Sequence, residues 1–260
     1  MSNSIVIYYF SGTGNTLLLV DEMRKVFEQH SFDVKLIPLT CSTIPVFDND
    51  SMLGLAFPIN SQSTLPFIWK FIKSLPKTSK TQAFMLGTFN NSSGMAKPLY
   101  YTLKRKGYIP VGCCEISMPN NTTVTDFNRT EDNKRLSSAR KKIRDYAESI
   151  VNGTSKWLPI NTGSGFVSLL TRNFSIPWIF MRIPYSFGAD IQKCTNCGTC
   201  IKHCPVNNIK EEKNPVYLRH CEFCMRCISN CPKQAISAKR VKNLKARKAI
   251  CTGFTGEVTE

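Results

Sequence analysis

The stretch from Cys194 to Pro205 reads C-T-N-C-G-T-C-I-K-H-C-P, and the stretch from Cys221 to Pro232 reads C-E-F-C-M-R-C-I-S-N-C-P. Both follow the pattern C-x-x-C-x-x-C-x-x-x-C-P, and together they hold eight of the twelve cysteines of the chain. Three thiolates separated by two residues can surround three corners of one iron cube, while the fourth, followed by Pro, reaches the other cube. The spacing therefore predicts a small domain that holds two [4Fe-4S] clusters.

The same spacing divides the cysteines into two ligand sets, each with three members from one copy and one from the other. The first set is Cys194, Cys197, Cys200 and Cys231, and the second set is Cys221, Cys224, Cys227 and Cys204. A zinc site is the main alternative, although zinc sites usually place two C-x-x-C pairs well apart. A disulfide framework is a weaker one, because this is a metal spacing and we expect no secretory signal at the N-terminus.

A second motif lies near the N-terminus, where a strand-like run leads into a loop rich in glycine and hydroxyl groups. Ile5–Phe10 is β-branched and aromatic, as in a strand buried on both faces, and a helical pattern follows from Leu17 to His30. The loop between them consists of Ser11, Gly12, Thr13, Gly14, Asn15 and Thr16. Such a loop presents backbone N–H groups, hydroxyls and the positive end of a helix to an anion. We therefore predict a phosphate-binding loop.

Three kinds of phosphate site are distinguished by the residues of this loop. A Walker loop would need a lysine after its glycines, and the dinucleotide fingerprint would need a glycine where Leu17 stands. A loop of hydroxyls without lysine suits a phosphomonoester held by backbone and hydroxyl groups. An unoccupied strand-to-helix turn remains the alternative.

The first half of the chain continues the alternation of strands and helices. Strands are predicted at 32–39, 52–57, 82–89 and 108–118, and helices at 65–75, 94–106 and 131–152. Five strands alternating with helices predict an α/β fold with a doubly wound parallel sheet, which binds its ligand outside the carboxyl ends of the strands.

Loops rich in amides and hydroxyls follow three of these strands. They are Pro58, Ile59, Asn60 and Ser61 after the third strand, Thr88, Phe89, Asn90 and Asn91 at the end of the fourth, and residues 119–122 after the fifth. We expect these loops to hydrogen-bond the edge of a flat heteroaromatic ring, because they meet at the same sheet edge as the phosphate loop. The alternative is that these residue types simply form turns.

With S-G-T-G-N-T as its phosphate loop, the first half resembles a flavodoxin domain, and the whole chain resembles the family of anaerobe proteins that fuse such a domain to a dicluster ferredoxin. C-P-V-N-N-I after the first cysteine run and M-P-N-N after the fifth strand fit this resemblance. It implies that the phosphate of FMN sits on Ser11–Thr16. It also implies that the flavin ring lies between the loops at 58–61 and 88–91, with Phe89 as the aromatic that can stack on it.

The length of 260 residues and these patterns suggest two domains joined by a connector. We expect a flavodoxin-like domain at 1–154, an aromatic-rich connector at 155–188 with a short helix near Phe166–Phe174, a small α+β dicluster domain at 189–238 and a basic tail at 239–260. Peripheral membrane contact by the connector is a minor alternative. No apolar run approaches the roughly 18 residues of a membrane span, so we expect a cytoplasmic protein.

The formal net charge of +16 is unusual for proteins of this kind. Two clusters and an FMN phosphate would lower it to on the order of +10. The basic residues gather on the helix at 131–152 and on the tail, and such runs are usually solvated faces. The sharper hypothesis is that they steer an acidic redox protein, such as a ferredoxin or flavodoxin, toward the chain. Nucleic-acid binding is not expected, because no recognition motif accompanies the charge.

These inferences combine into an electron-transfer iron–sulfur flavoprotein that passes single electrons between two [4Fe-4S] clusters and FMN. No side chain stands out as a catalytic acid or base, and no nicotinamide domain is evident, so reduction of a substrate at the flavin stays open. The alternative is a ferredoxin-like carrier or redox sensor whose flavodoxin-like domain is empty.

Overall fold

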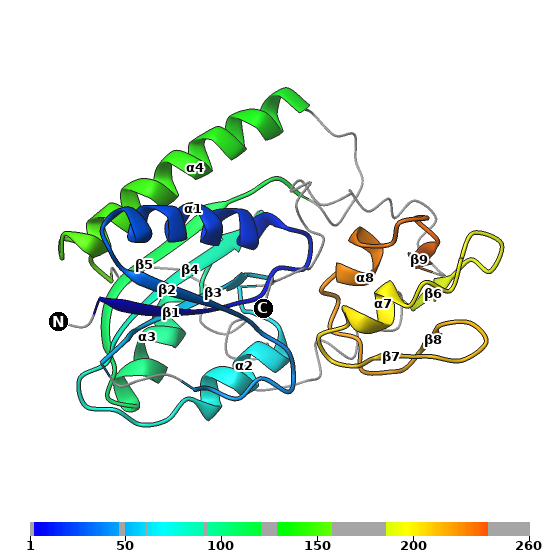
Figure 1. Cartoon of the computed structure of the whole chain (residues 1–260), viewed down its shortest axis with the longest axis horizontal. Coiled ribbons are helices and arrows are strands. Elements are labelled where there is room, and N and C mark those ends of the chain that lie inside the picture. The colour runs from blue at the N-terminus through cyan, green and yellow to red at the C-terminus, as the bar shows by residue number, and fades with distance from the viewer. Residues whose placement is uncertain are drawn as a thin grey trace.

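The computed structural model describes residues 3–46, 50–60, 62–90, 93–120, 129–157 and 186–238. Its largest element is a parallel sheet of five strands in the order β2-β1-β3-β4-β5 (Figure 1). The strands are β1 (Ser4–Tyr9), β2 (Asp33–Pro38), β3 (Met52–Pro58), β4 (Gln82–Phe89) and β5 (Ile109–Ser117). This order is that of the flavodoxin-like doubly wound sheet, whose ligand crevice opens between β1 and β3. The predicted fold class is confirmed.

Helices cover both faces of this sheet (Figure 1). The elements α1 (Asn15–Gln29) and α4 (Arg129–Val151) pack on one face, and α2 (Pro66–Ser74) and α3 (Ala96–Arg105) pack on the other. Side chains of β1 alternate between the two layers, since Ile5 and Ile7 contact the α1 side while Val6 and Tyr8 contact the α2 side. Both faces of β1 are therefore buried, which is why its sequence is continuously apolar.

A second, smaller unit is built from short elements around the cysteines. Here β6 (Phe187–Ala189) pairs with β9 (Ile236–Ala238), and β7 (Ile209–Lys210) pairs with β8 (Val216–Tyr217), both antiparallel. One-turn helices α7 (Thr199–Lys202) and α8 (Arg226–Ser229) complete the unit. Because β6 begins at Phe187, the unit includes two residues that we assigned to the connector.

The two cysteine copies repeat each other in backbone conformation as well as in sequence. In the first copy Asn196 and Gly198 adopt φ angles of 52° and 71°, and the corresponding Phe223 and Met225 adopt 54° and 59°. A left-handed conformation costs a residue other than glycine about 1–2 kcal/mol. Asparagine and glycine adopt this conformation more readily than phenylalanine and methionine. The second copy therefore holds two bulky residues, Phe223 and Met225, in a backbone conformation that disfavours them.

Several predicted features fall outside the described residues. They are Ser61, Asn91, the short helix near Phe166–Phe174 with most of the connector, and the basic tail at 239–260. The first connector residues that are described pack on the sheet domain, where Ser155 Oγ donates to the Val111 carbonyl and Trp157 Nε1 donates to the Ala96 carbonyl. Within the described ranges, no helix combines the length and the apolarity that crossing a membrane requires.

Candidate functional site

A cleft of about 570 Å³, including the open space at its mouth, lies at the carboxyl ends of the sheet strands. It is the crevice where a doubly wound sheet binds its ligand. The predicted residues that line it are Ser11, Gly12, Thr13, Asn15, Thr16, Pro58, Ile59, Asn60, Thr88, Phe89 and Asn90. Of the predicted residues that are described, Gly14 does not line it, and Met118, Pro119 and Asn120 complete the wall. The structure thus brings the three loops and the glycine-rich turn together.

One end of the cleft is the turn between β1 and α1. Gly14 stands at the N-cap of α1 with a φ of 97°, and its N–H donates to Ser11 Oγ at 3.1 Å. No side chain caps this end of α1, and the first turn contains no acidic residue. The helix therefore directs its positive end at the cleft without a competing carboxylate, as an anion site requires.

Two side chains tie this turn to the neighbouring loops. The hydroxyls of Thr16 and Thr88 lie 2.8 Å apart, and Asn15 Nδ2 donates to the Pro119 carbonyl at 2.9 Å. The other amide atom, Asn15 Oδ1, is buried and has no hydrogen-bond partner among the described residues. A buried acceptor in the wall of a cleft is satisfied when a ligand hydroxyl donates to it. The donor set therefore fits a phosphate ester that carries a hydroxylated chain.

The loop after β3 is held in place by backbone hydrogen bonds. The Ile59 N–H donates to the Thr88 carbonyl at 2.7 Å, and Asn60 and Ser63 exchange backbone hydrogen bonds of 2.7 and 2.9 Å. Thr64 Oγ1 donates to the Pro58 carbonyl at 2.9 Å. These bonds hold the described part of the loop against the end of β4, at the edge of the cleft.

The dicluster unit supplies two residues of the same cleft, Phe223 and Cys224. Sequence reasoning placed only one aromatic, Phe89, at the predicted ring site and missed Phe223. One feature of the sequence could have indicated Phe223: it occupies the position that Asn196 has in the first copy, where the backbone is left-handed. A bulky residue is unusual at such a position. A residue held in such a conformation often marks a functional site.

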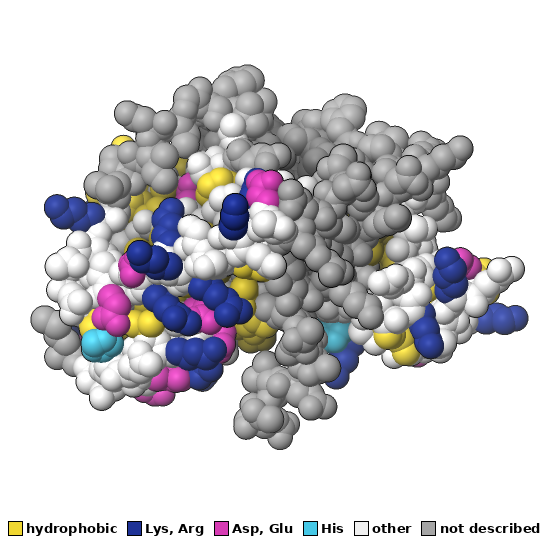
Figure 2. Space-filling view, turned by 90° about the horizontal axis from the view of Figure 1, so that it is seen from above, with side chains coloured by type: hydrophobic (Ala, Val, Ile, Leu, Met, Phe, Trp, Pro, Cys, Tyr) yellow, Lys and Arg dark blue, Asp and Glu magenta, His cyan; other side chains and the backbone are white. Residues whose placement is uncertain are grey.

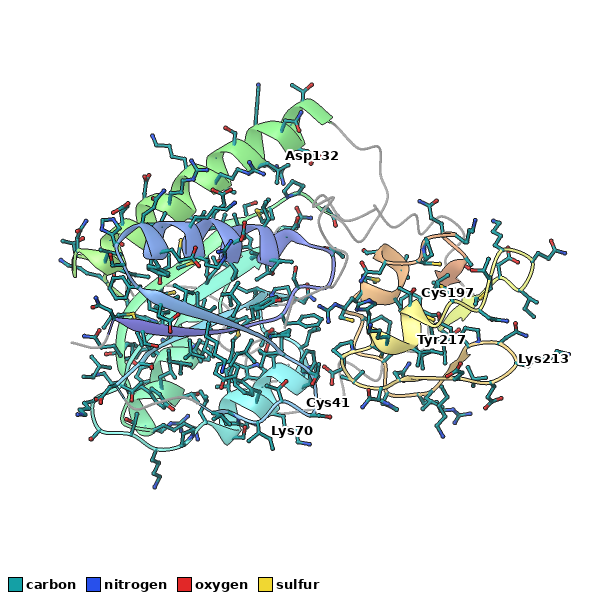
Figure 3. All side chains as sticks on the ribbon, viewed as in Figure 1. Cys41, Lys70, Asp132, Cys197, Lys213 and Tyr217 are labelled. Carbon is teal, nitrogen blue, oxygen red and sulfur yellow. The ribbon has the colours of Figure 1, made fainter. Side chains whose placement is uncertain are left out.

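Direct contacts dock the dicluster unit on the sheet domain. Glu222 Oε2 accepts the Phe67 N–H at 3.0 Å and so caps the start of α2, and the Cys41 N–H donates to the Pro205 carbonyl at 2.7 Å. Figure 3 shows Cys41 on the side of the sheet domain that faces the dicluster unit. These bonds satisfy backbone N–H groups of one domain with acceptors of the other, which defines one docked position.

The first predicted ligand set surrounds one small cavity. Cys194, Cys197, Cys200 and Cys231 all line it, although they come from both copies of the motif. The Ala235 N–H donates to Cys231 Sγ at 3.2 Å. Cys197 is exposed. This set therefore reaches the surface of the dicluster unit at Cys197, whereas Cys200 is buried.

The second predicted set, Cys204, Cys221, Cys224 and Cys227, is half-buried throughout. Burial raises the pKa of Cys224 to about 12, with smaller contributions from Cys221 and Cys204. Burial also raises the pKa of Cys227 well above its usual value, and the nearby thiols of Cys224, Cys221, Cys204 and Cys200 add to this effect. The Asn208 N–H donates to Cys204 Sγ at 3.2 Å, which repeats the bond at Cys231 in the other copy. A metal binds cysteine as the thiolate, so binding of a cluster at Cys224 and Cys227 would oppose this effect of burial.

Comparison with known proteins agrees with the iron–sulfur assignment of the second unit. Residues 187–232 match a family model described as a 4Fe-4S dicluster domain. A search of curated proteins gives no significant match.

Solved structures similar to this chain include flavodoxins. The flavodoxin of Streptococcus pneumoniae TIGR4 is 12% identical over 57% of this chain and 98% of its own, with a TM-score of 0.42. That of Megasphaera elsdenii is 22% identical over 53% of this chain and 98% of its own, with a TM-score of 0.39. For rubredoxin oxygen:oxidoreductase of Desulfovibrio gigas the values are 18% identity, 58% of this chain, 37% of that chain and a TM-score of 0.36. The strand order, and not these weak likenesses, establishes the fold of the first domain.

Proposed function

We propose that this chain is an electron-transfer iron–sulfur flavoprotein. Its flavodoxin-like domain would bind FMN in the cleft, and the eight cysteines of its 4Fe-4S dicluster domain would hold two clusters, four cysteines to each. One observation carries the proposal: Cys224 belongs to a predicted ligand set and also lines the cleft. FMN exchanges one or two electrons and an iron–sulfur cluster exchanges one, so the pairing links one-electron carriers to two-electron chemistry.

The binding roles follow from the geometry of the cleft. The turn at Ser11–Thr16 and the uncapped start of α1 would hold the phosphate through backbone N–H groups and hydroxyls. Asn15 Oδ1 would accept a hydrogen bond from the hydroxylated chain. Phe89 and Phe223 would contact the ring, one from each domain. The cleft is then complete only when the two domains are docked.

The two cysteine sets differ in their place relative to the cleft. The second set includes Cys224 in the cleft wall, whereas the first set includes the exposed Cys197. An external redox protein would therefore exchange electrons at the first set, and the second set would stand between it and the flavin. Tyr217 belongs to the dicluster unit (Figure 3), where it interacts electrostatically with Cys200 of the first set and Cys227 of the second.

We also propose that the external partner is an acidic redox protein of the cytoplasm. Figure 2 shows Lys and Arg side chains interspersed with Asp and Glu on the face seen from above. Part of the basic charge on α4 is neutralised there, because Arg135 pairs with Glu131 and Arg144 pairs with Glu22. Lys213 and Lys233, near the first cysteine set, are exposed and form a better candidate for docking.

Cofactor analysis of anaerobically purified protein tests the proposal. We expect about eight iron atoms, as two four-iron clusters require, together with stoichiometric FMN. Cys224→Ser is expected to lower the iron content and to slow reduction of the flavin by an external donor, while the matched variant Cys113→Ser, in β5 and away from the dicluster unit, changes neither. Zinc in place of iron would refute the proposal. Iron without flavin would favour the carrier or sensor with an empty flavodoxin-like domain.

A further inference from the structure

Arg226 is a buried cation beside the second cysteine set. Only 9% of the residue is exposed, although arginine is almost never buried without a specific reason. Its guanidinium carbon lies 5.2 Å from the centre of the Phe10 ring, at the end of β1. It also interacts electrostatically with Cys224 and Cys204, two members of the second set. The charge therefore sits at the junction of the two domains, next to the cysteines nearest the cleft.

The first copy of the cysteine motif provides a comparison for Arg226 of the second copy. Thr199 occupies the corresponding position in the first copy, where its hydroxyl lies 3.3 Å from Cys197 Sγ. The backbone N–H groups of both residues make the same kind of bond, Thr199 to Cys197 and Arg226 to Cys224. The two copies therefore match in backbone at this position, where the second has a positive charge and the first a neutral hydroxyl. Elsewhere in the motif Glu222 replaces Thr195 and Ser229 replaces Lys202, and of these three differences only Arg226 adds a cation to the second copy.

We propose that Arg226 is a positioning residue for the electron: its charge raises the reduction potential of the second site and so directs electrons from the exposed first site toward the flavin. The inference rests on the function proposed above. An electron added to the second site adds negative charge next to Arg226, and in a buried environment a nearby cation stabilises that charge strongly. Burial alone would have the opposite effect, because removing a charged site from water disfavours further charge.

The electron balance of the step is simple. A low-potential one-electron donor protein would supply one electron to a cluster held by the first set. That electron would pass to a cluster held by the second set, so that the first is oxidised and the second reduced, with no bond or proton changing place. The residues of the cleft would hold the FMN as the final one-electron acceptor. Arg226 changes only the relative free energies of these one-electron states.

Redox titration followed by EPR on anaerobically purified protein tests the role of Arg226. In Arg226→Gln we expect one cluster potential to fall and the other to stay. A tenfold change in the sharing of the electron between the sites corresponds to about 59 mV for a one-electron couple. Arg226→Lys keeps the charge and should restore most of the potential. The reciprocal variant Thr199→Arg should raise the potential of the other cluster.

The outcomes separate this inference from the proposed function. If wild-type protein lacks the clusters or the flavin, the proposed function fails and the inference fails with it. If Arg226→Gln retains full iron and flavin but keeps both potentials, the role of Arg226 alone is overturned. If Arg226→Gln loses iron, the test uses two other variants, Arg226→Met and Thr199→Arg. The inference is overturned if a variant that retains its clusters also retains both wild-type potentials. It is also overturned if both variants lose their clusters.

Discussion

The carbonyl oxygen of Cys224 lies against Gly12, so closely that a methyl group at residue 12 would stand 1.9 Å from it. Gly12 belongs to the turn at the phosphate end of the cleft, and Cys224 belongs to the second cysteine set. Only glycine allows two backbones to approach in this way. The contact joins the predicted flavin site to the predicted cluster site without an intervening side chain.

Gly12→Ala should therefore separate the two domains. The methyl group cannot be accommodated by a side chain, because its obstacle is backbone. We expect flavin reduction by an external donor to slow at least about tenfold while the iron content stays unchanged, since small displacements of reacting groups have large effects on rate. Stopped-flow absorbance measures the rate. Gly153→Ala is the control: it strains the backbone at a φ of 67°, but nothing lies within 4 Å of the added methyl group, so the docking of the domains is unaffected. Equal rates in wild type and Gly12→Ala would contradict the docked arrangement.

Phe223→Asn places in the second copy the residue that the first copy has at Asn196. The backbone should relax, since asparagine tolerates the left-handed conformation better than phenylalanine. The cleft would lose an aromatic side chain that can contact the flavin. Such a contact contributes about 1 kcal/mol to the free energy of binding, so the dissociation constant of FMN should rise about fivefold. Fluorescence titration with FMN measures it. Unchanged affinity would show that Phe223 does not contact the flavin.

Ser11→Ala removes the oxygen that accepts the Gly14 N–H. One hydrogen bond is worth about 1 kcal/mol, so FMN should bind about fivefold more weakly while riboflavin, which lacks the phosphate, should be little affected. Ser74→Ala serves as the control, because that hydroxyl also makes a local bond, to the Phe71 carbonyl, but lies away from the cleft. Equal losses for FMN and riboflavin would argue against a phosphate site at this turn.

Removal of iron should unfold the dicluster unit and leave the sheet domain folded. The buried apolar core of that unit is small and consists of Phe187, Cys200, Ile209, Ile228, Ile236 and Ala238. A unit of this size depends on its metal for stability. Hydrogen exchange is expected to rise across 187–238 after chelation, while α1 and the strands of the sheet keep their protection. Retained protection in both domains would show that the clusters are not structural.

The rate of reduction by an acidic ferredoxin should fall as the salt concentration rises, because screening weakens electrostatic steering. Lys213, at the tip of the hairpin farthest from the sheet domain in Figure 3, and Lys233 stand near the first cysteine set. Lys213→Gln with Lys233→Gln is expected to lower the association rate about tenfold at low salt. Arg140→Gln with Lys141→Gln, on α4, is the matched control. A rate indifferent to salt would remove the case for an acidic partner.

Much of the fold could be predicted because local patterns determine it. The continuous apolar run of β1 reflects burial on both faces, and the turn at Ser11–Thr16 requires its glycine at Gly14 for a φ of 97°. The expected strands and helices of the first domain agree with the observed ones to within a few residues. What could not be predicted involves residues far apart in the chain. Phe223 lies more than 100 residues from Phe89, and only docking brings both to one cleft.

By itself, the sequence determined the class of the sheet, because strand periodicity is a local property of the chain. Its ligand spacing, which is also local, predicted the division of the cysteines into two sets. The tertiary structure alone decided that the second set faces the cleft, that Glu222 caps α2 and that Arg226 is buried at the junction. The physical reason is that docking depends on surface shape and on which backbone groups are left to be satisfied, and neither has a periodic signature in the sequence.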